Sequence, residues 1–390
     1  MAGRTKTPGA REVEARLAPV RVGEPLLCLR DVTVTVRSRR GDYPVVHGVS
    51  LDVRAGEILG VVGESGCGKS VTMSAAMGLL PSNLEVSGGA IDFRGLDLRT
   101  AGEPVLEQLR GGDLSMVFQD PMTALDPLYT VGSQILEAIR LHSDLRGEAA
   151  RELAVDYLRR VGLSEPERRM GQYPFELSGG MRQRVVIAIA LCCSPSLLIC
   201  DEPTTALDVT IQAKVLDLVR ELHGQLGNSV VFISHNMGVI ASVCDRVAVM
   251  YGGHVVERGT VDEIFYATAH PYTRGLLACM PTLTGPREEP LVPIAGMVPD
   301  PRRLGEGCPF AARCPRCMRV CRRAMPPELA LGGQHSCACW LCVSEGAGAG
   351  AGATAATGDE TPGAGALACD PAGAATSGPT EGDSREGSHA

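Results

Sequence analysis

The sequence predicts an α/β fold built around a parallel β-sheet, with an antiparallel β layer, a helical segment and a small cysteine-rich C-terminal extension attached to it. Three observations predict this fold. An apolar run over residues 58–62 indicates a buried strand, which leads through a glycine-rich loop into a helix. Strand-like and helix-like segments alternate again from residue 185 to about 250, as is typical of a parallel sheet. Residues 121 to about 184 instead hold helical runs, such as 135–142 and 149–161.

The 390-residue chain divides into four parts. Residues 1–24 are polar, and we expect a flexible N-terminus there. Residues 25–285 are expected to form the main domain, with a helical subdomain at about 121–184. A cysteine-rich region is expected over 286–343. Residues 344–390 contain glycine, alanine, threonine and acidic residues but no aromatic side chain, so this tail is expected to be disordered.

Composition excludes several classes of protein. The net charge is −8, so a broad basic surface for nucleic acid is not expected. No apolar run approaches the ~18–20 residues that a membrane-spanning helix needs. The first residues lack the apolar stretch of a secretory signal. We therefore expect a cytosolic protein.

The antiparallel layer is predicted from the strand-like residues 26–36, a charged turn over 37–42 and a second strand at about 45–53. A further short strand is expected at 91–95. The first two of these strands form an antiparallel β layer that leads into the apolar strand 58–62.

The residues that follow that strand read GESGCGKS and fit the phosphate-binding pattern G-x-x-x-x-G-K-[ST]. Three glycines let backbone N–H groups turn toward phosphate oxygens at the start of a helix. Lys69 would reach the terminal phosphates, and the Ser70 hydroxyl would ligate Mg²⁺. A chance glycine turn is the alternative, but strand, loop and helix occur in the order that a nucleotide site needs. The residues expected to contact the nucleotide here are Gly63, Glu64, Ser65, Gly66, Cys67, Gly68, Lys69, Ser70 and Val71.

Cys67 lies within this loop, next to a helix N-terminus and two residues before a lysine. Such a setting lowers the pKa of a thiol. We therefore expect Cys67 to be reactive toward alkylating reagents.

Polar residues also follow two later strands. The apolar run 197–200 ends in Asp201 and Glu202; the first would hold the metal, and the second would orient and polarise the attacking water. On their own, two acidic residues after a strand are often only a solvated loop. The strand 230–234 ends at His235, which is either a satisfied strand-end residue or a contact for the γ-phosphate.

A Ser-Gly-Gly turn at Ser178, Gly179 and Gly180 opens another helix, and its serine and backbone N–H groups could bind an anion. An ordinary helix N-cap is the alternative. The chain then has two phosphate-type sites but one phosphate loop, which favours a dimer that sandwiches the nucleotide.

These motifs together resemble the ATP-binding subunit of an ABC transporter, a P-loop NTPase, over residues 25–343. The resemblance implies Glu202, His235 and Gln119 as catalytic residues, and Mg²⁺ held by Ser70, Gln119 and Asp201. The motifs that carry it are the Walker A loop Gly63–Ser70, the Q-loop Gln119, the signature Ser178–Met181, the Walker B pair Asp201 and Glu202, the D-loop Ala206–Asp208 and the switch His235.

One position departs from that family. The aromatic residue that usually stacks on adenine is expected near Val36, which is aliphatic, and Tyr43 is the alternative.

The finer resemblance is to the oligopeptide and dipeptide importers, through residues 118–127, 270–277 and the C-terminal 307–315. It implies an ATPase that energises peptide uptake from the cytoplasmic side of the membrane. The implied partners are a second ATP-binding subunit, identical or homologous, two membrane-spanning permease subunits docked after Gln119, and indirectly a solute-binding protein, with no nucleic acid. An importer of nickel or another small solute is one alternative. A soluble ABC protein of DNA repair or translation is another, although those usually carry tandem ATPase units or a long coiled insertion.

Fifteen cysteines are many for a cytosolic chain, and their crowding near the C-terminus favours a metal over disulfides in a reducing compartment. The resemblance implies a 4Fe-4S cluster held by Cys308, Cys314, Cys321 and Cys337. Structural zinc, through two C-x-x-C pairs, and plain reduced thiols are the alternatives. The region is expected to lie away from the phosphate sites and to act structurally or in regulation. The remaining cysteines of this region are Cys317, Cys339 and Cys342.

Overall fold

A mixed β-sheet lies at the centre of the molecule, in a computed structural model that describes residues 12–13, 15–204, 208–280 and 293–343. These residues all belong to one compact unit. The strands of this main sheet are β3 (Ile58–Val62), β6 (Leu114–Val117), β7 (Leu197–Asp201), β8 (Ser229–Ser234), β9 (Arg246–Tyr251), β10 (His254–Thr260), β11 (Leu329–Gly332) and β12 (His335–Cys337). They lie in the order β11-β12-β10-β9-β3-β8-β7-β6.

The middle of the sheet is parallel. Strand β3 pairs in parallel with β8 and β9, and β7 pairs in parallel with β8 and β6. Every residue of β3, β7, β8 and β9 is buried, because helices or a second sheet cover both faces. The carboxyl ends of these parallel strands therefore meet at one edge of the sheet, where ligands bind in α/β folds.

The cysteine-rich region extends the same sheet. Strand β10 pairs antiparallel with β9, and β12 then pairs antiparallel with β10, with Cys337 opposite Glu257. Strand β11 forms the edge beside β12. This part of the chain thus continues the sheet that carries the phosphate loop.

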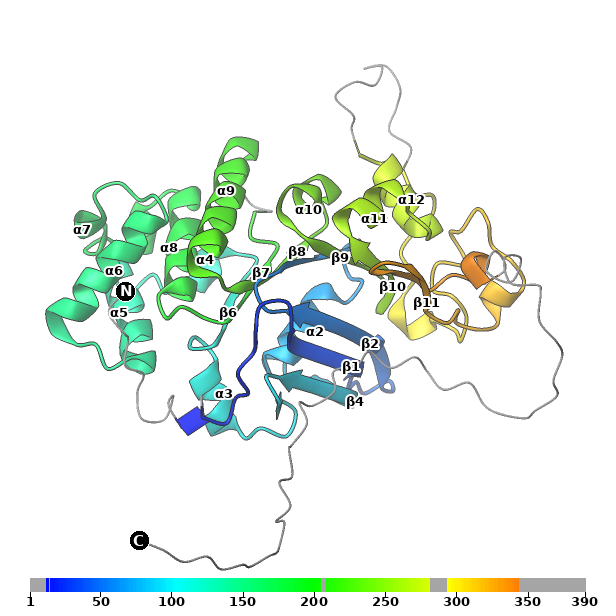
Figure 1. Cartoon of the computed structure of the whole chain (residues 1–390), viewed down its shortest axis with the longest axis horizontal. Helices are drawn as coiled ribbons and strands as arrows, with labels where there is room; N and C mark the ends of the chain where they lie inside the picture. Colours follow the sequence, from blue (N-terminus) through cyan, green and yellow to red (C-terminus); the bar gives the residue numbers. More distant parts are fainter. Residues whose placement is uncertain (1–11, 14, 205–207, 281–292, 344–390) are drawn as a thin grey trace, which may run out of the picture. The chain divides into compact units, whose positions relative to one another are not determined.

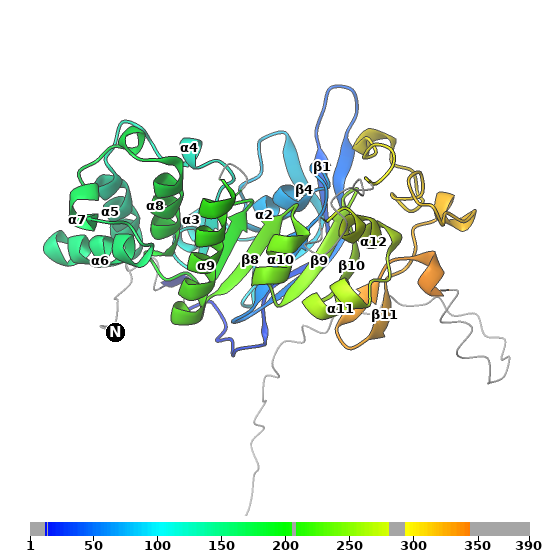
Figure 2. The same cartoon turned by 90° about the horizontal axis from the view of Figure 1, so that it is seen from above.

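Helices cover one face of the main sheet, and a second sheet lies toward the other. In Figures 1 and 2, α9 (Val209–Leu226), α10 (Met237–Val243) and α11 (Val261–Tyr266) lie on one side, while α2 (Lys69–Ala76) lies on the opposite side. The second sheet packs against α2 and has the order β2-β1-β4-β5. Its strands are β1 (Pro25–Val36), β2 (Tyr43–Arg54), β4 (Leu84–Phe93) and β5 (Leu96–Asp97).

The helical group lies beside β6 and β7, at the edge opposite the cysteine-rich region (Figures 1 and 2). Its core is made by apolar residues spaced four apart, such as Ile135 and Ile139, or Ala154 and Leu158, which are all fully buried. Its helices are α4 (Pro121–Ala124), α5 (Val131–His142), α6 (Gly147–Arg160), α7 (Pro166–Arg169) and α8 (Gly179–Leu191). The other helices are α3 (Glu103–Leu109) and α12 (Pro271–Ala278).

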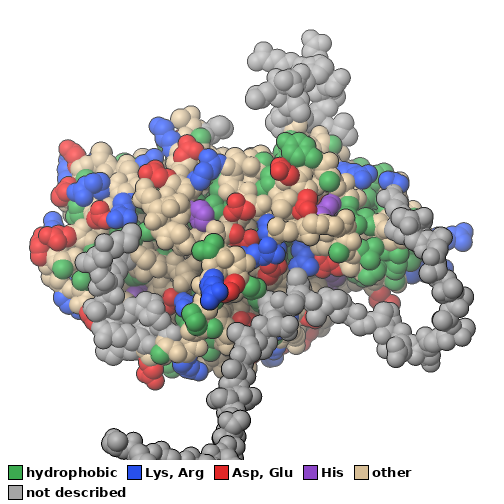
Figure 3. Space-filling view, viewed as in Figure 1, with side chains coloured by type: hydrophobic (Ala, Val, Ile, Leu, Met, Phe, Trp, Pro, Cys, Tyr) green, Lys and Arg blue, Asp and Glu red, His purple; other side chains and the backbone are tan. Residues whose placement is uncertain are grey.

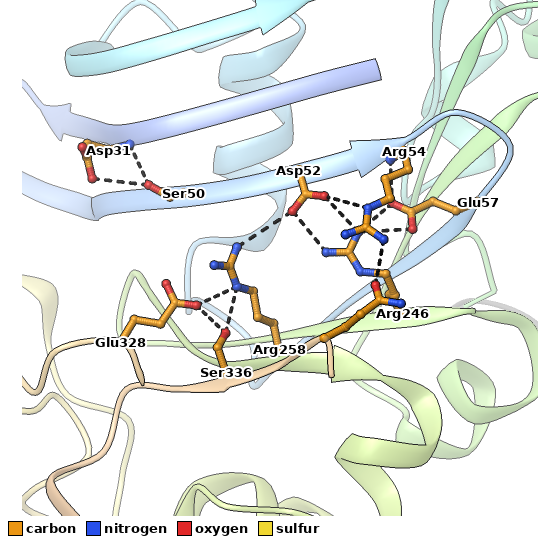
Figure 4. A network of polar contacts seen from close by, with 10 residues as sticks. Asp31, Ser50, Asp52, Arg54, Glu57, Arg246, Arg258, Glu328 and Ser336 are labelled. Atoms are coloured by element: carbon orange, nitrogen blue, oxygen red, sulfur yellow. Dashed lines mark hydrogen bonds and ion pairs between the residues drawn. The ribbon is translucent and has the colours of Figure 1, made fainter. Parts of the chain in front are cut away.

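A buried ion-pair network joins the two sheets (Figure 4). Arg246 of β9 donates from both terminal nitrogens to the Asp52 carboxylate of β2, at 3.1 Å each, and also contacts the Glu57 carboxylate at 3.1 Å. Arg258 of β10 forms an ion pair with Glu328 at 2.6 Å. This network links β2 with β9, the neighbour of β3 in the main sheet.

The predicted α/β fold, with its antiparallel layer and helical segment, is confirmed. One predicted strand is too short, because the strand expected at 91–95 is the end of β4, which begins at Leu84. Among the described residues, no helix has the length and apolar character needed to span a membrane. On the face drawn in Figure 3, acidic and basic side chains are interspersed, without a broad area of one sign.

Candidate active site

The carboxyl ends of four parallel strands bring the predicted site residues together around Glu202. The Gln119 amide, two residues after β6, donates to Glu202 Oε2 at 3.3 Å. His235 Nδ1, directly after β8, lies 3.2 Å from the same oxygen. The Lys69 ammonium lies 3.9 Å from Glu202 Oε1. Residues from distant parts of the sequence thus surround one carboxylate.

Glu202 has a left-handed backbone, with φ of 46°. A non-glycine residue held in this region stores conformational strain, which is common where side chains must be aimed at a reaction centre. Its N–H donates to the Ile233 carbonyl of β8 at 3.1 Å, which holds the strained residue against the neighbouring strand.

The phosphate loop connects β3 to α2 and encloses the lysine. Lys69 is only 4% exposed, and its ammonium donates to the carbonyls of Gly63 at 2.8 Å and Glu64 at 3.1 Å. Gly63 has no room for a side chain, because a Cβ there would lie 2.2 Å from the Met250 carbonyl oxygen. Gly68 precedes α2 with φ of 102°, a conformation that favours glycine. The motif glycines are therefore required by the backbone of this loop.

The Ser70 hydroxyl donates to Asp201 Oδ1 at 2.8 Å. Burial raises the pKa of Asp201 above its ordinary value and outweighs this hydrogen bond, and the neighbouring Glu202 charge adds to the increase. A divalent cation would offset the cost of holding two carboxylates so close together. Hydroxyl, carboxylate and amide oxygens are also the ligands that Mg²⁺ prefers, so Ser70, Asp201 and Gln119 fit the ion.

Cys67 is fully buried in the loop. Burial raises the pKa of its thiol and outweighs the nearby Lys69 charge, which acts to lower it. The expected reactive, low-pKa cysteine is therefore wrong, because the helix N-terminus and the lysine act on a thiol that water does not reach.

Ser178 caps the N-terminus of α8, where its hydroxyl accepts from the Met181 N–H at 3.4 Å. Gly180 lies against α9, since a Cβ there would be 2.8 Å from Ile211. Among the described residues, no hydrogen bond or ion pair joins 178–181 to the phosphate loop of the same chain.

Two further predicted positions are only partly placed. Ala206 and Leu207 of the D-loop lie outside the described residues, while Asp208 caps α9 and accepts from the Ile211 N–H at 2.9 Å. Val36 and Tyr43, the two candidates for the adenine-stacking position, lie opposite each other at one end of the β1–β2 pair.

Six of the seven C-terminal cysteines fall into two sets that share Cys339. Cys308, Cys314, Cys321 and Cys339 line one pocket. Cys337 instead lies in β12 and packs with Cys339 and Cys342. The structure therefore places Cys339, and not the expected Cys337, around the pocket with the other three. In the described part of the chain, no group of three or more His, Cys, Asp or Glu side chains is arranged to hold a metal ion.

The cysteine-rich region does not lie away from the phosphate loop, contrary to our expectation. Arg313, next to Cys314, pairs with the Glu64 carboxylate. The two residues are 249 positions apart in the sequence, so no local pattern could have predicted the contact.

Large apolar side chains are exposed on both sides of Gln119 in the sequence and in the helical group. Leu128 is 80% exposed, and the others are Phe118, Met122, Tyr129 and Phe175. Exposed apolar side chains of this size are candidates for contacts with another protein.

Comparison with known proteins identifies two family models in the chain. The ABC transporter model matches residues 46–205. The model for the C-terminal region of oligopeptide/dipeptide transporters matches residues 256–321.

Curated relatives match over most of their length. The dipeptide transport ATP-binding protein of Bacillus subtilis is 48% identical over 319 residues, which cover 82% of this chain and 95% of the relative. The oligopeptide transport ATP-binding protein of the same organism is 47% identical, with 81% and 88% covered. A dimeric ATP-binding cassette, solved in a post-hydrolysis state with ADP and Pi, superposes with a TM-score of 0.55 at 27% identity, covering 60% of this chain and 98% of the cassette.

Proposed function

The chain belongs to the ATP-binding subunits of ABC transporters, in the branch with the oligopeptide and dipeptide transporters, and we propose that it hydrolyses ATP to drive uptake of di- or oligopeptides. The observation that carries this proposal is the convergence of four motifs at one sheet edge. A strained glutamate lies there between an amide, a histidine and the lysine of a phosphate loop.

We assign the roles as follows. Backbone N–H groups of residues 63–71 and the Lys69 ammonium bind the phosphates. The Mg²⁺ ligands are Ser70, Asp201 and Gln119, and the ion neutralises charge on the phosphates. Glu202 orients the attacking water and accepts its proton, while His235 contacts the γ-phosphate.

The nucleotide site is proposed to be completed by a second subunit. Residues 178–180 form a helix start with free N–H groups, which suits an anion, yet they make no contact with their own phosphate loop among the described residues. The related cassette solved with ADP and Pi is a dimer. A head-to-tail dimer, with an identical or homologous partner, would place Ser178–Gly180 of one subunit against the ATP held by the other.

We propose that the apolar surface after Gln119 docks membrane-spanning permease subunits, two of them per transporter. Three of its exposed residues, Met122, Leu128 and Tyr129, lie within ten positions after the glutamine that contacts Glu202, so docking and catalysis share one segment. The subunit would then lie on the cytoplasmic side of the membrane as a peripheral protein. The solute-binding protein would act on it only through the permease.

The transported solute can be tested by reconstitution. Full-length chain, its permease subunits and its solute-binding protein are placed in vesicles, and uptake of a labelled dipeptide and of Ni²⁺ is measured. We expect ATP-dependent uptake of the dipeptide. Uptake of Ni²⁺ without the peptide would favour the nickel-importer alternative.

The same vesicles test the docking surface. The double variant L128S/Y129S is expected to lower uptake at least about tenfold, because central apolar contacts dominate interface energies, while MgATP binding stays unchanged. Tyr266→Ser is the matched control, since that side chain is 87% exposed but lies on α11. Equal uptake by both variants would remove this surface from docking.

For the cysteine pocket, we propose a 4Fe-4S cluster held by Cys308, Cys314, Cys321 and Cys339. The support is that four thiols, the ligand set of such a cluster, line one pocket in a region with little apolar core of its own. Bound there, the cluster would hold the region's loops together.

Iron and sulfide analysis after anaerobic purification tests this cluster. We expect about four iron and four acid-labile sulfide per chain. Cys339→Ser should lower the iron content, whereas Cys337→Ser and the control Cys317→Ser should not. Stoichiometric zinc without sulfide, or metal-free protein, would contradict the proposal, and iron loss only in Cys337→Ser would restore Cys337 as a ligand.

A further inference from the structure

We infer that Arg313 is a positioning residue for ATP binding, through which the cysteine-rich region sets the affinity of the phosphate loop for nucleotide. The inference rests on the proposed function in taking residues 63–70 as the loop that binds ATP phosphates. It concerns a residue outside every motif that predicted the site.

Glu64 is an acidic residue within a loop that must bind an anion. A bare carboxylate beside the phosphates would oppose binding, because like charges repel strongly where water is partly excluded. Arg313 neutralises it with a two-pronged contact. The Nη1 nitrogen donates to Glu64 Oε2 at 2.5 Å, and Nη2 donates to Oε1 at 3.0 Å. Arginine has the fork geometry that this pairing requires.

The guanidinium is itself held in place. Arg313 is 5% exposed, and its remaining hydrogen bonds go to the carbonyls of Ile294 and Ala295 and to the Tyr251 hydroxyl, at 3.0–3.2 Å. Tyr251 ends strand β9, the neighbour of β3 in the sheet. Every nitrogen of the guanidinium therefore has an acceptor, and the side chain can hold the loop in one position.

The backbone of Glu64 connects this contact to the reaction centre. Its N–H donates to the Tyr272 hydroxyl of α12 at 2.8 Å, and its carbonyl accepts from the Lys69 ammonium at 3.1 Å. Arg313 thus acts on the residue that holds the phosphate-binding lysine.

The cysteine pocket is packed against the same anchors. Phe310 lines the pocket, and its ring lies 5.2 Å from that of Tyr251 and 5.4 Å from that of Tyr272. Cys314, also in the pocket lining, directly follows Arg313 in the chain. A rearrangement of the pocket would therefore move both contacts of Glu64 at once.

The experiment measures MgATP affinity and steady-state ATPase kinetics on the full-length chain. Arg313→Gln is expected to raise the Kd and the KM for MgATP about tenfold, a typical coupling between neighbouring sites, and to leave kcat within about twofold. Arg313→Lys keeps the charge but loses the fork, so its Kd for MgATP should lie between those of wild type and Arg313→Gln. This variant replaces Arg313→Gln in the test if the glutamine variant folds poorly. Arg319→Gln, an exposed arginine of the same region, is the control and should bind like wild type.

A double-mutant cycle separates positioning from stability. In a Glu64→Gln background, Arg313→Gln should change the Kd by less than about twofold, since the charge that it neutralises is gone. Unchanged affinity in both Arg313 variants, or equal effects of Arg313→Gln in the two backgrounds, would overturn the inference. If the variants give that result and wild type still binds MgATP, only the inference about Arg313 fails and the proposed function stands. If wild type does not bind MgATP, both the inference and the proposed function are overturned.

Discussion

Replacing Glu202 by glutamine is expected to lower kcat for ATP hydrolysis by at least about 100-fold and to leave the Kd for MgATP within a few-fold of wild type. Glutamine has the shape of glutamate but can neither accept the proton of the attacking water nor polarise it. The loop residues that bind the phosphates are unchanged. The variant should therefore accumulate in a nucleotide-bound dimer, measurable by light scattering in the presence of MgATP.

The geometry around Glu202 explains why this residue carries so large an effect. Its two carboxylate oxygens face different partners: Oε1 faces the Lys69 ammonium, and Oε2 faces Gln119 and His235. The side chain is therefore aimed by groups from the loop, from β6 and from β8. The hydrogen bond from its N–H to the Ile233 carbonyl holds this strained residue at the point where the γ-phosphate of bound ATP is proposed to lie.

Glu107→Gln is the matched control, because Glu107 is an exposed glutamate on α3 and should keep wild-type turnover. Near-wild-type hydrolysis by the Glu202 variant would take the catalytic role away from this residue. A variant that lost ATP binding along with turnover would instead indicate that Glu202 supports the loop through its contact with Lys69.

The sequence was sufficient to predict the centre of the fold and the groups around Glu202. Phosphate-loop glycines, strand-end acids and a strand-end histidine each follow an apolar run, and parallel strands bring their carboxyl ends to one edge. The local patterns therefore carried three-dimensional information. That is why Lys69, Asp201 and His235 were expected at one place and lie there.

The features that sequence reasoning missed depend on packing between distant segments. Cys67 has the neighbours that lower a thiol pKa, yet burial dominates, and burial is not a property of the loop sequence. Cys337 and Cys339 are two residues apart, so their positions in the sequence do not show which one lines the pocket. Cys337 pairs opposite Glu257 of β10, whereas Cys339, after the end of β12, lines the pocket. The Arg313–Glu64 contact likewise depends on the extension folding back onto the loop.

The second large effect is expected at Arg246, which joins the two sheets. Arg246→Met should lower the free energy of unfolding by about 3–5 kcal/mol, because it leaves the Asp52 and Glu57 carboxylates buried without their cation. All three side chains are about 90% buried, so solvent cannot replace the lost partner. The urea concentration at half-unfolding, followed by circular dichroism, measures the loss. Arg220→Met is the control, since that side chain is exposed and its ion pair with Asp217 is weak.

The same network predicts how stability depends on pH. Burial acts to raise the pKa of Asp52, but its hydrogen bonds and charge contact with Arg246 outweigh burial and hold the pKa below its ordinary value. A carboxyl whose pKa is lowered on folding stabilises the native state above its unfolded pKa of about 3.9, and that contribution is lost as the pH falls through the folded value. Burial raises the pKa of Glu57, so protonation of Glu57 acts on stability in the opposite direction. The contribution of Asp52 should be lost below about pH 4 in wild type, and Arg246→Met should lose less over the same range because its Asp52 has no arginine to pair with. If stability falls with pH equally in both proteins, the pairing of Asp52 with Arg246 does not stabilise the folded protein.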